Sequence, residues 1–336
     1  MTRSIGSSTG SHRGSFGVAF SLGLLAAASA HAQAVDIPAI LDADLKAPPT
    51  AVVLQYGHQF GAEVEDGGGT EVARDTAFFG LAHRFALGER TTFFAIGNYT
   101  LHGYDFDGGR DENNETNRYQ WDRVHRGVLA GMLGHDLDEH WRIVGGGLVR
   151  TWGETGAEFD ETLTGGLLGG FSYQSSEDFS IGLLIGAISK LEGGVGLLPV
   201  PTVMWNVSDA LRLDVGMVQL VDPGIGAQLT YQLTPELALG TGVTYQSREF
   251  RLSGQRRATA TDPGRNRTDD GGVGKETEIP IFATLRFRPT PTIELDLNGG
   301  VALRGNLRVE DEDGGRLADD DYEPAGILAF KGQFFF

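Results

Sequence analysis

The sequence of 336 residues predicts an all-β protein: a closed, antiparallel, up-and-down transmembrane β-barrel of about 14 strands. Three observations support this. Apolar and polar residues alternate along many successive segments, which is the period of a strand with one dry and one wet face. The connections alternate between short turns and mostly longer polar segments. Beyond residue 32, no apolar stretch reaches the roughly 20 residues that a spanning helix needs, so the chain would cross a membrane as strands.

The first element is a signal peptide. Arg3 and Arg13 form a weakly basic start, an uncharged apolar run follows over 16–28, and Ala30-His31-Ala32 is a small-residue cleavage site. We expect cleavage after Ala32. The predicted division is a signal peptide over 1–32, a short periplasmic N-terminal segment over 33–49, and the barrel over 50–336.

Fourteen segments after the signal peptide read as strands in seven hairpins. Because short turns in such barrels lie on the periplasmic side, an even count places both chain ends there. The predicted strands cover 50–61, 74–87, 91–104, 121–136, 140–152, 162–174, 179–190, 198–207, 210–220, 224–233, 237–251, 277–289, 292–309 and 322–336.

The segment 292–309 shows the alternation most clearly. Leu295, Leu297 and Leu307 share one parity, and charged residues share the other, with no break in phase. Applied to the other strands, this parity gives a set of predicted pore-lining residues: Arg84, Arg142, Arg150, Arg212, Asp214, Arg286, Arg288, Glu294, Asp296, Arg304, Arg308 and Lys331.

This lining has two interpretations. Rings of arginine and lysine select anions, so a basic wall predicts a pore that favours anions. Alternatively, the arginines pair with carboxylates on neighbouring strands, as burial of charge requires. Both remain open at this stage.

Acidic residues gather in the predicted loops. The chain holds 27 basic and 45 acidic residues, and loss of Arg3 and Arg13 with the signal peptide changes the formal net charge from −18 to −20. Clustered carboxylates can bind divalent cations, although such runs are more often solvated loops. The weak candidates for a metal site are Asp311, Asp313, Asp319 and Asp321. No cofactor is expected.

Pro199 and Pro201 lie in a predicted strand of a closed wall, although proline cannot donate a ladder hydrogen bond. Either the strand begins after them, or the wall is locally unpaired. An unpaired stretch would be a candidate lateral opening.

Catalytic patterns are weak. The chain has no cysteine, and it lacks the G-x-S-x-G, H-E-x-x-H and P-loop sequences. We therefore predict that the protein is not an enzyme.

The last strand ends on Phe336, with Leu328, Phe330 and Phe334 on the same parity. It resembles the closing strand that Gram-negative outer-membrane barrels present to their assembly machinery. This resemblance implies a bacterial outer-membrane location. It also implies contact with outer-membrane lipid, lipopolysaccharide and the barrel-assembly machinery. We further expect a monomer and no nucleic-acid partner.

Two finer resemblances assign no activity. The segments Leu211–Met217 and Ile293–Phe330 resemble an uncharacterised bacterial barrel family of unknown function. The strand count is similar to that of FadL-type fatty-acid transporters and of the OmpG pore. The FadL type carries a substantial N-terminal hatch, whereas few residues precede the first strand here.

The leading functional hypothesis is a passive or weakly selective pore for small polar or anionic solutes. The first alternative is a FadL-like transporter of an apolar compound through a lateral opening near Pro199 and Pro201. The second alternative is a structural or surface-interaction barrel with a plugged lumen.

Overall fold

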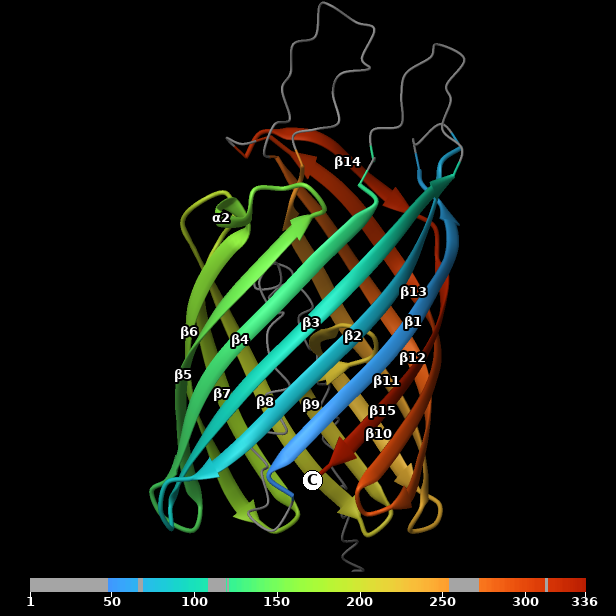
Figure 1. The fold of residues 1–336 in the computed structure, drawn as a ribbon. Coiled ribbons are helices and arrows are strands. Elements are labelled where there is room, and N and C mark those ends of the chain that lie inside the picture. Colours follow the sequence, from blue (N-terminus) through green and yellow to red (C-terminus); the bar gives the residue numbers. More distant parts are fainter. Residues whose placement is uncertain (1–47, 66–68, 108–118, 120, 254–271, 312–313) are drawn as a thin grey trace, which may run out of the picture.

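The computed structural model describes residues 48–65, 69–107, 119, 121–253, 272–311 and 314–336. These form one antiparallel sheet closed into a tall barrel, shown in Figure 1. The predicted signal peptide, most of the segment 33–49 and Asp313 lie outside the described residues. The elements are β1 (Thr50–Glu63), β2 (Glu71–Ala86), β3 (Thr91–Asp107), β4 (Arg123–Asp136), β5 (Trp141–Glu154), α2 (Phe159–Thr162), β6 (Leu163–Ser176), β7 (Phe179–Ser189), β8 (Val195–Ser208), β9 (Leu211–Gln219), β10 (Pro223–Gln232), β11 (Leu237–Arg251), β12 (Val273–Thr290), β13 (Ile293–Glu310), β14 (Arg316–Tyr322) and β15 (Ala325–Phe335).

The first and last strands close the barrel. β1 pairs with β15, with Tyr56 opposite Phe330, and β15 pairs on its other edge with β13. β14 also pairs with β13, so β14 and β15 are two parts of one wall strand, separated at Glu323 and Pro324. The wall therefore has 14 strands, and the predicted fold class is confirmed.

The outer surface of the barrel is apolar. Leu129 and Leu167, on β4 and β6, are about 70% exposed, whereas the inward-facing Val128 and Leu168 beside them are buried. Such a surface is stable only against lipid, and a closed sheet leaves no unpaired edge in the bilayer. The protein is thus an outer-membrane β-barrel. None of the helices in the described part of the chain is long and apolar enough to span a bilayer.

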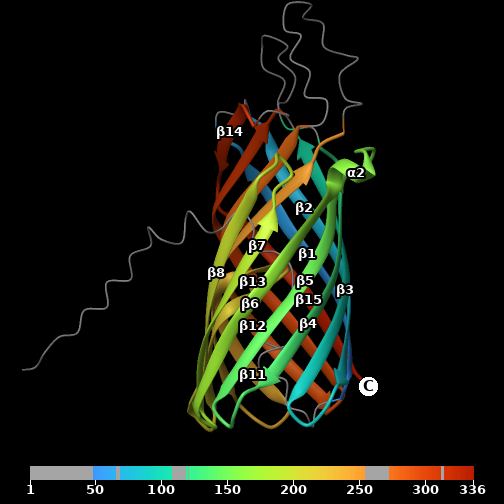
Figure 2. The ribbon, with the colours of Figure 1, turned by 90° about the vertical axis from the view of Figure 1, so that its left-hand side faces the viewer.

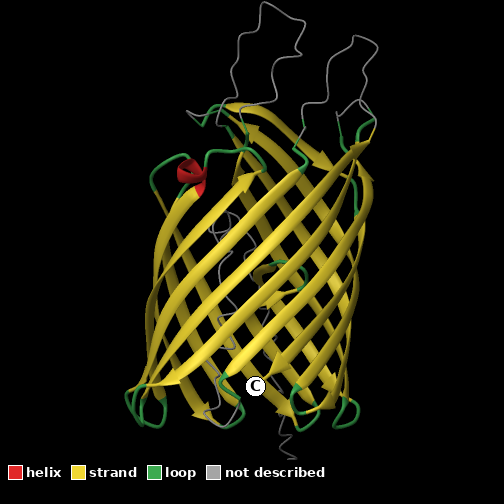
Figure 3. Cartoon of the chain, viewed as in Figure 1, coloured by secondary structure: helices red, strands yellow, loops and turns green. Residues whose placement is uncertain are grey.

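Short turns occupy one end of the barrel, where the C-terminus also lies (Figure 3). The β4–β5 turn is typical: the Asp138 carboxylate accepts hydrogen bonds of 2.8 Å from the backbone N–H groups of His140 and Trp141. These bonds hold the pKa of Asp138 below its ordinary value. The opposite end carries the longer connections and the short helix α2 (Figure 2).

The predicted unbroken phase of the strand 292–309 is wrong. Opposite Glu278 and Pro280, the β13 partners jump from Gly305 to Ala302, which marks a bulge. Leu303 is exposed, yet Leu307 and Val309 are buried. Beyond the bulge, the residues of β13 that would have faced outward therefore face inward, and those that would have faced inward face outward.

Because of this bulge, Arg304 and Arg308 do not face the lumen as predicted. They share the outer face with the β14 carboxylates, where Arg304 pairs with Asp321 at 3.3 Å and Arg308 with Asp319 at 3.2 Å. The predicted acidic loop before residue 322 is thus mostly the strand β14, whose outward carboxylates Asp319 and Asp321 pair with the arginines of β13.

Candidate functional site

The β9–β10 turn, Leu220–Asp222, folds into the barrel instead of ending at the rim. Figures 1 and 3 show it at mid-height in the lumen. The amide of Gln55 on β1 donates to the carbonyl of Leu220. A Cβ on Gly57 would lie 2.7 Å from Val221, so only glycine permits this approach. The turn therefore crosses the lumen and rests on the opposite wall.

Asp222, at the tip of the turn, is fully buried among cationic side chains. Its carboxylate lies 2.7 Å from Arg248 on β11 and 3.9 Å from Arg126 on β4. His102 on β3 lies 3.7 Å away. A buried carboxylate needs such partners, and here they come from three separate strands. The ionic contacts fix the turn in place.

A second group of charges joins β2 to β12 across the lumen. Arg74 on β2 pairs with Glu276 and, at 2.9 Å, with Glu278. Arg248 also reaches Glu278, at 2.8 Å, and thereby connects this group to Asp222. The Tyr322 hydroxyl donates to Glu276 at 3.1 Å. All of these side chains are buried, so the network spans the lumen as one unit.

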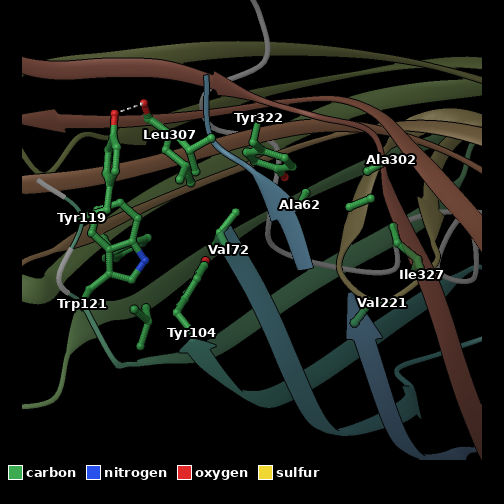
Figure 4. Close-up of a cluster of buried hydrophobic side chains, with 14 of the residues drawn as sticks. Ala62, Val72, Tyr104, Tyr119, Trp121, Val221, Ala302, Leu307, Tyr322 and Ile327 are labelled. Atoms are coloured by element: carbon green, nitrogen blue, oxygen red, sulfur yellow. Dashed lines mark hydrogen bonds between the residues drawn. The ribbon is translucent and has the colours of Figure 1, made fainter. Parts of the chain in front are cut away.

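An apolar cluster adjoins the network (Figure 4). Trp121 stands edge-on to Phe250 at 5.3 Å and to Tyr104 at 5.8 Å. The Tyr119 hydroxyl donates to the Leu307 carbonyl at 3.3 Å and so ties the β3–β4 connection to β13. Together with the network, these buried side chains occupy part of the upper lumen.

The remaining predicted lining residues lie on inward positions, and most are neutralised. Pairs join Arg286 to Asp296 at 2.9 Å, Arg288 to Glu294, Lys331 to Asp296 at 2.8 Å, Arg212 to Asp214 at 2.8 Å, and Arg142 to Asp136 at 3.6 Å. Arg84 is partly buried. The paired interpretation therefore describes these side chains better than an unbalanced basic wall does.

Arg150 is buried deeper. Its Nε donates to Thr164 at 2.8 Å, and its guanidinium lies 5.8 Å from the Trp152 ring, which Arg126 approaches at 5.1 Å. Whether Arg150 and the other inward residues line a conducting path stays a prediction.

Parity along the predicted strands 237–251 and 277–289 places Arg248 and Glu278 inward, whereas sequence reasoning gives no inward role to Asp222, Arg74 and Glu276. Asp222 sits in a connection that is unusually short for its end of the barrel, and this was the one available signal. Arg74 is the first residue of the predicted strand 74–87 and is absent from the predicted lining, and Glu276 lies in a predicted loop. The alternation of apolar and polar residues predicts which face of a strand a side chain occupies. It does not predict which side chains meet across the lumen.

The wall is interrupted between β8 and β11. β8 pairs with β7 along Val195–Trp205, but with β9 only from Val203 onward. β11 pairs with β10 only up to Tyr245. The upper edges of β8 (Val195–Thr202) and β11 (Gln246–Phe250) therefore lack ladder hydrogen bonds on the sides where β9 and β10 would pair; we call these two edges the seam.

Pro199 and Pro201 lie within β8 on the seam. The strand continues through both, opposite Ile185 and Leu183 of β7. The second alternative from the sequence therefore holds: the wall is locally unpaired there. An edge with no partner requires no N–H donor, which explains how β8 tolerates two prolines.

The interior beside the seam is packed with apolar side chains. Leu198 and Val200 of β8 pack in one buried cluster with Leu184 of β7, Met217 of β9 and Ile225 of β10. An apolar compound would find matching side chains on this side of the lumen, whereas a hydrated ion would not.

The candidate metal residues have other partners. Asp319 accepts from Asn306 at 2.9 Å and pairs with Arg316 at 2.8 Å, and Asp321 also accepts from Asn306 at 2.9 Å. Asp311 accepts from the Gly315 backbone N–H at 2.6 Å. Across the described ranges, no group of three or more acidic or histidine side chains is arranged to hold a metal ion.

Comparisons with known proteins identify no family. No family model and no curated protein matches the chain. Among solved structures, an outer membrane channel from Pseudomonas putida F1 is similar, with 15% identity over 87% of this chain and 97% of that chain and a TM-score of 0.43. A Pseudomonas aeruginosa FadL homologue is similar, with 11% identity over 92% of this chain and 96% of that chain and a TM-score of 0.47. The KdgM porin is also similar, with 10% identity over 84% of this chain and 99% of that chain and a TM-score of 0.34. None of these similarities gives this chain a substrate.

Proposed function

We propose that the protein is an outer-membrane channel that passes small apolar compounds between the lumen and the bilayer through the seam. One observation carries the proposal: the hydrogen-bonded wall stops at the seam, and the buried side chains behind it, such as Leu198 and Val200, are apolar. The polar, anion-favouring pore has less support, because most of its arginines are paired with carboxylates.

The test is uptake of an apolar fluorescent dye, N-phenyl-1-naphthylamine, by Gram-negative cells that carry the protein in their outer membrane. We expect expression to raise the rate of uptake. Leu198→Asn should lower that rate about tenfold, because an amide beside the seam disfavours an apolar solute by more than 1 kcal/mol.

The matched control is Leu197→Asn. Leu197 is 66% exposed on the lipid side of the same strand, whereas Leu198 points to the interior and is buried, with only 4% of its surface exposed. Uptake should be nearly unchanged in this variant, and heat-modifiable gel mobility should show that both variants fold. Equal uptake by the two variants would overturn the proposal.

A plugged surface barrel is the second candidate, and the network that bridges Arg74 to Glu278 favours it. Planar-bilayer recordings and dye uptake together distinguish the possibilities. Neither ion conductance nor dye uptake would indicate the plugged barrel. A steady, anion-preferring conductance would indicate the polar pore instead.

A further inference from the structure

The outer face of β11 at the seam is covered, although the rest of that face meets lipid. Val243, lower on the same face, is 41% exposed, whereas Ser247 and Glu249 are buried. The pairing of β11 with β12 keeps its register through this stretch, so Ser247 and Glu249 still point outward. Another segment must therefore lie outside β11.

That segment is the β7–β8 turn, Lys190–Gly194. The Leu191 backbone N–H donates to the Glu249 carboxylate at 3.4 Å, and Arg251 donates to the Leu191 carbonyl at 2.8 Å. The two sides of the seam thus overlap. The end of β11 lies inside, where Arg251 pairs with Gly153 of β5, and the β7–β8 turn lies outside.

One lysine adds an ionic contact between the outer layer and the barrel, beside the hydrogen bonds of Leu191. Lys275 on β12 pairs with Glu192 of the turn, and it also lies 2.6 Å from Glu310 on β13 and 3.8 Å from Glu249. It is the shared cation of three carboxylates. Two of these belong to the fixed wall, and Glu192 alone belongs to the turn.

The tight geometry of the turn depends on two glycines. Gly193 and Gly194 adopt φ values of 90° and 83°, which glycine reaches without strain. Below the turn, the edge of β8 that faces the seam has no partner strand, so moving the turn outward breaks no ladder hydrogen bond on that side.

From this geometry we propose that the β7–β8 turn is a flap that closes the seam from outside, and that Lys275 is its latch. The inference rests on the proposed lateral route. Breaking the contact between Lys275 and Glu192 releases the flap and opens the seam to the bilayer. Fixing that contact keeps the seam shut.

The experiment measures dye uptake in the same cells. Lys275→Gln should raise the uptake rate about fivefold, the effect of losing a partly buried ion pair. Arg304→Gln is the control, because Arg304 also pairs with an acid on the outer face but does not contact the flap. Its uptake should match that of the unaltered protein.

A reversible cross-link tests the opposite direction. The chain has no cysteine, so Glu192→Cys with Lys275→Cys provides a unique pair for a short bis-methanethiosulfonate, which joins the two thiols through disulfide bonds and releases methanesulfinate. Cross-linking should abolish uptake, and reduction should restore it. The control pair, Leu285→Cys with Leu297→Cys, joins residues already paired on β12 and β13, so its cross-link should change nothing.

The outcomes separate the latch from the proposed function. If the unaltered protein takes up dye and Leu198→Asn slows it, but Lys275→Gln and the cross-link leave uptake unchanged, the latch is overturned and the lateral route stands. If the unaltered protein takes up no dye and neither the latch variant nor the cross-link alters this, the lateral route and the latch are both overturned.

Discussion

Asp222→Ala should lower the free energy of unfolding by about 3–5 kcal/mol. The carboxylate of Asp222 is the anion that Arg248 and Arg126 share in the interior, at 2.7 and 3.9 Å. Its removal leaves excess positive charge buried where water cannot solvate it. The measurement is urea-induced unfolding in lipid vesicles, followed by tryptophan fluorescence, because Trp152 lies beside Arg126.

The control is Asp214→Ala. Asp214 also pairs with an arginine, at 2.8 Å, but the Arg212 side chain is 45% exposed. Exposed ion pairs contribute at most about 1 kcal/mol to stability, so Asp214→Ala should lower the free energy of unfolding by no more than that amount. Similar losses in the two variants would contradict the view that Asp222 anchors the turn. A double-mutant cycle with Arg248→Met would then give no coupling beyond the single changes.

The sequence predicted the strands well because lipid imposes a simple rule. Each strand of a barrel meets hydrocarbon on one face, so parity appears wherever that face is continuous. The closing strand before Phe336 and the strand that begins at Leu211 follow it. The rule fails at β13, where a bulge near Leu303 exchanges the inward and outward faces of the strand although apolar and polar residues keep alternating in the sequence.

The lumen could not be predicted in the same way. Contacts such as Arg74 with Glu278 join strands that are distant along the chain, and many inward arginines and carboxylates could pair equally well on paper. Only the closure of the barrel selects among them. Pro199 and Pro201 are a partial exception, because proline cannot donate a ladder hydrogen bond. They left two alternatives, a later start of the strand or an unpaired wall, and the structure shows the second.

Gly305→Ala should lower the free energy of unfolding by about 3 kcal/mol. Gly305 on β13 lies opposite Tyr322 on β14, and a Cβ there would lie 1.8 Å from the phenol ring. The ring must move away. Its hydroxyl would then lose the hydrogen bonds to Glu276 at 3.1 Å and Glu278 at 3.2 Å, which help to hold the network across the lumen.

Gly299→Ala, on the same strand, is the matched control, because no atom lies within 4 Å of the added Cβ. Urea unfolding of this variant should match that of the unaltered protein. In a Tyr322→Ala background the clash disappears, so adding Gly305→Ala should then cost little. If Gly305→Ala still lowers the free energy of unfolding by about 3 kcal/mol in that background, the contact with the Tyr322 ring is not the reason that this position needs glycine. The backbone conformation at Gly305 would then be the reason.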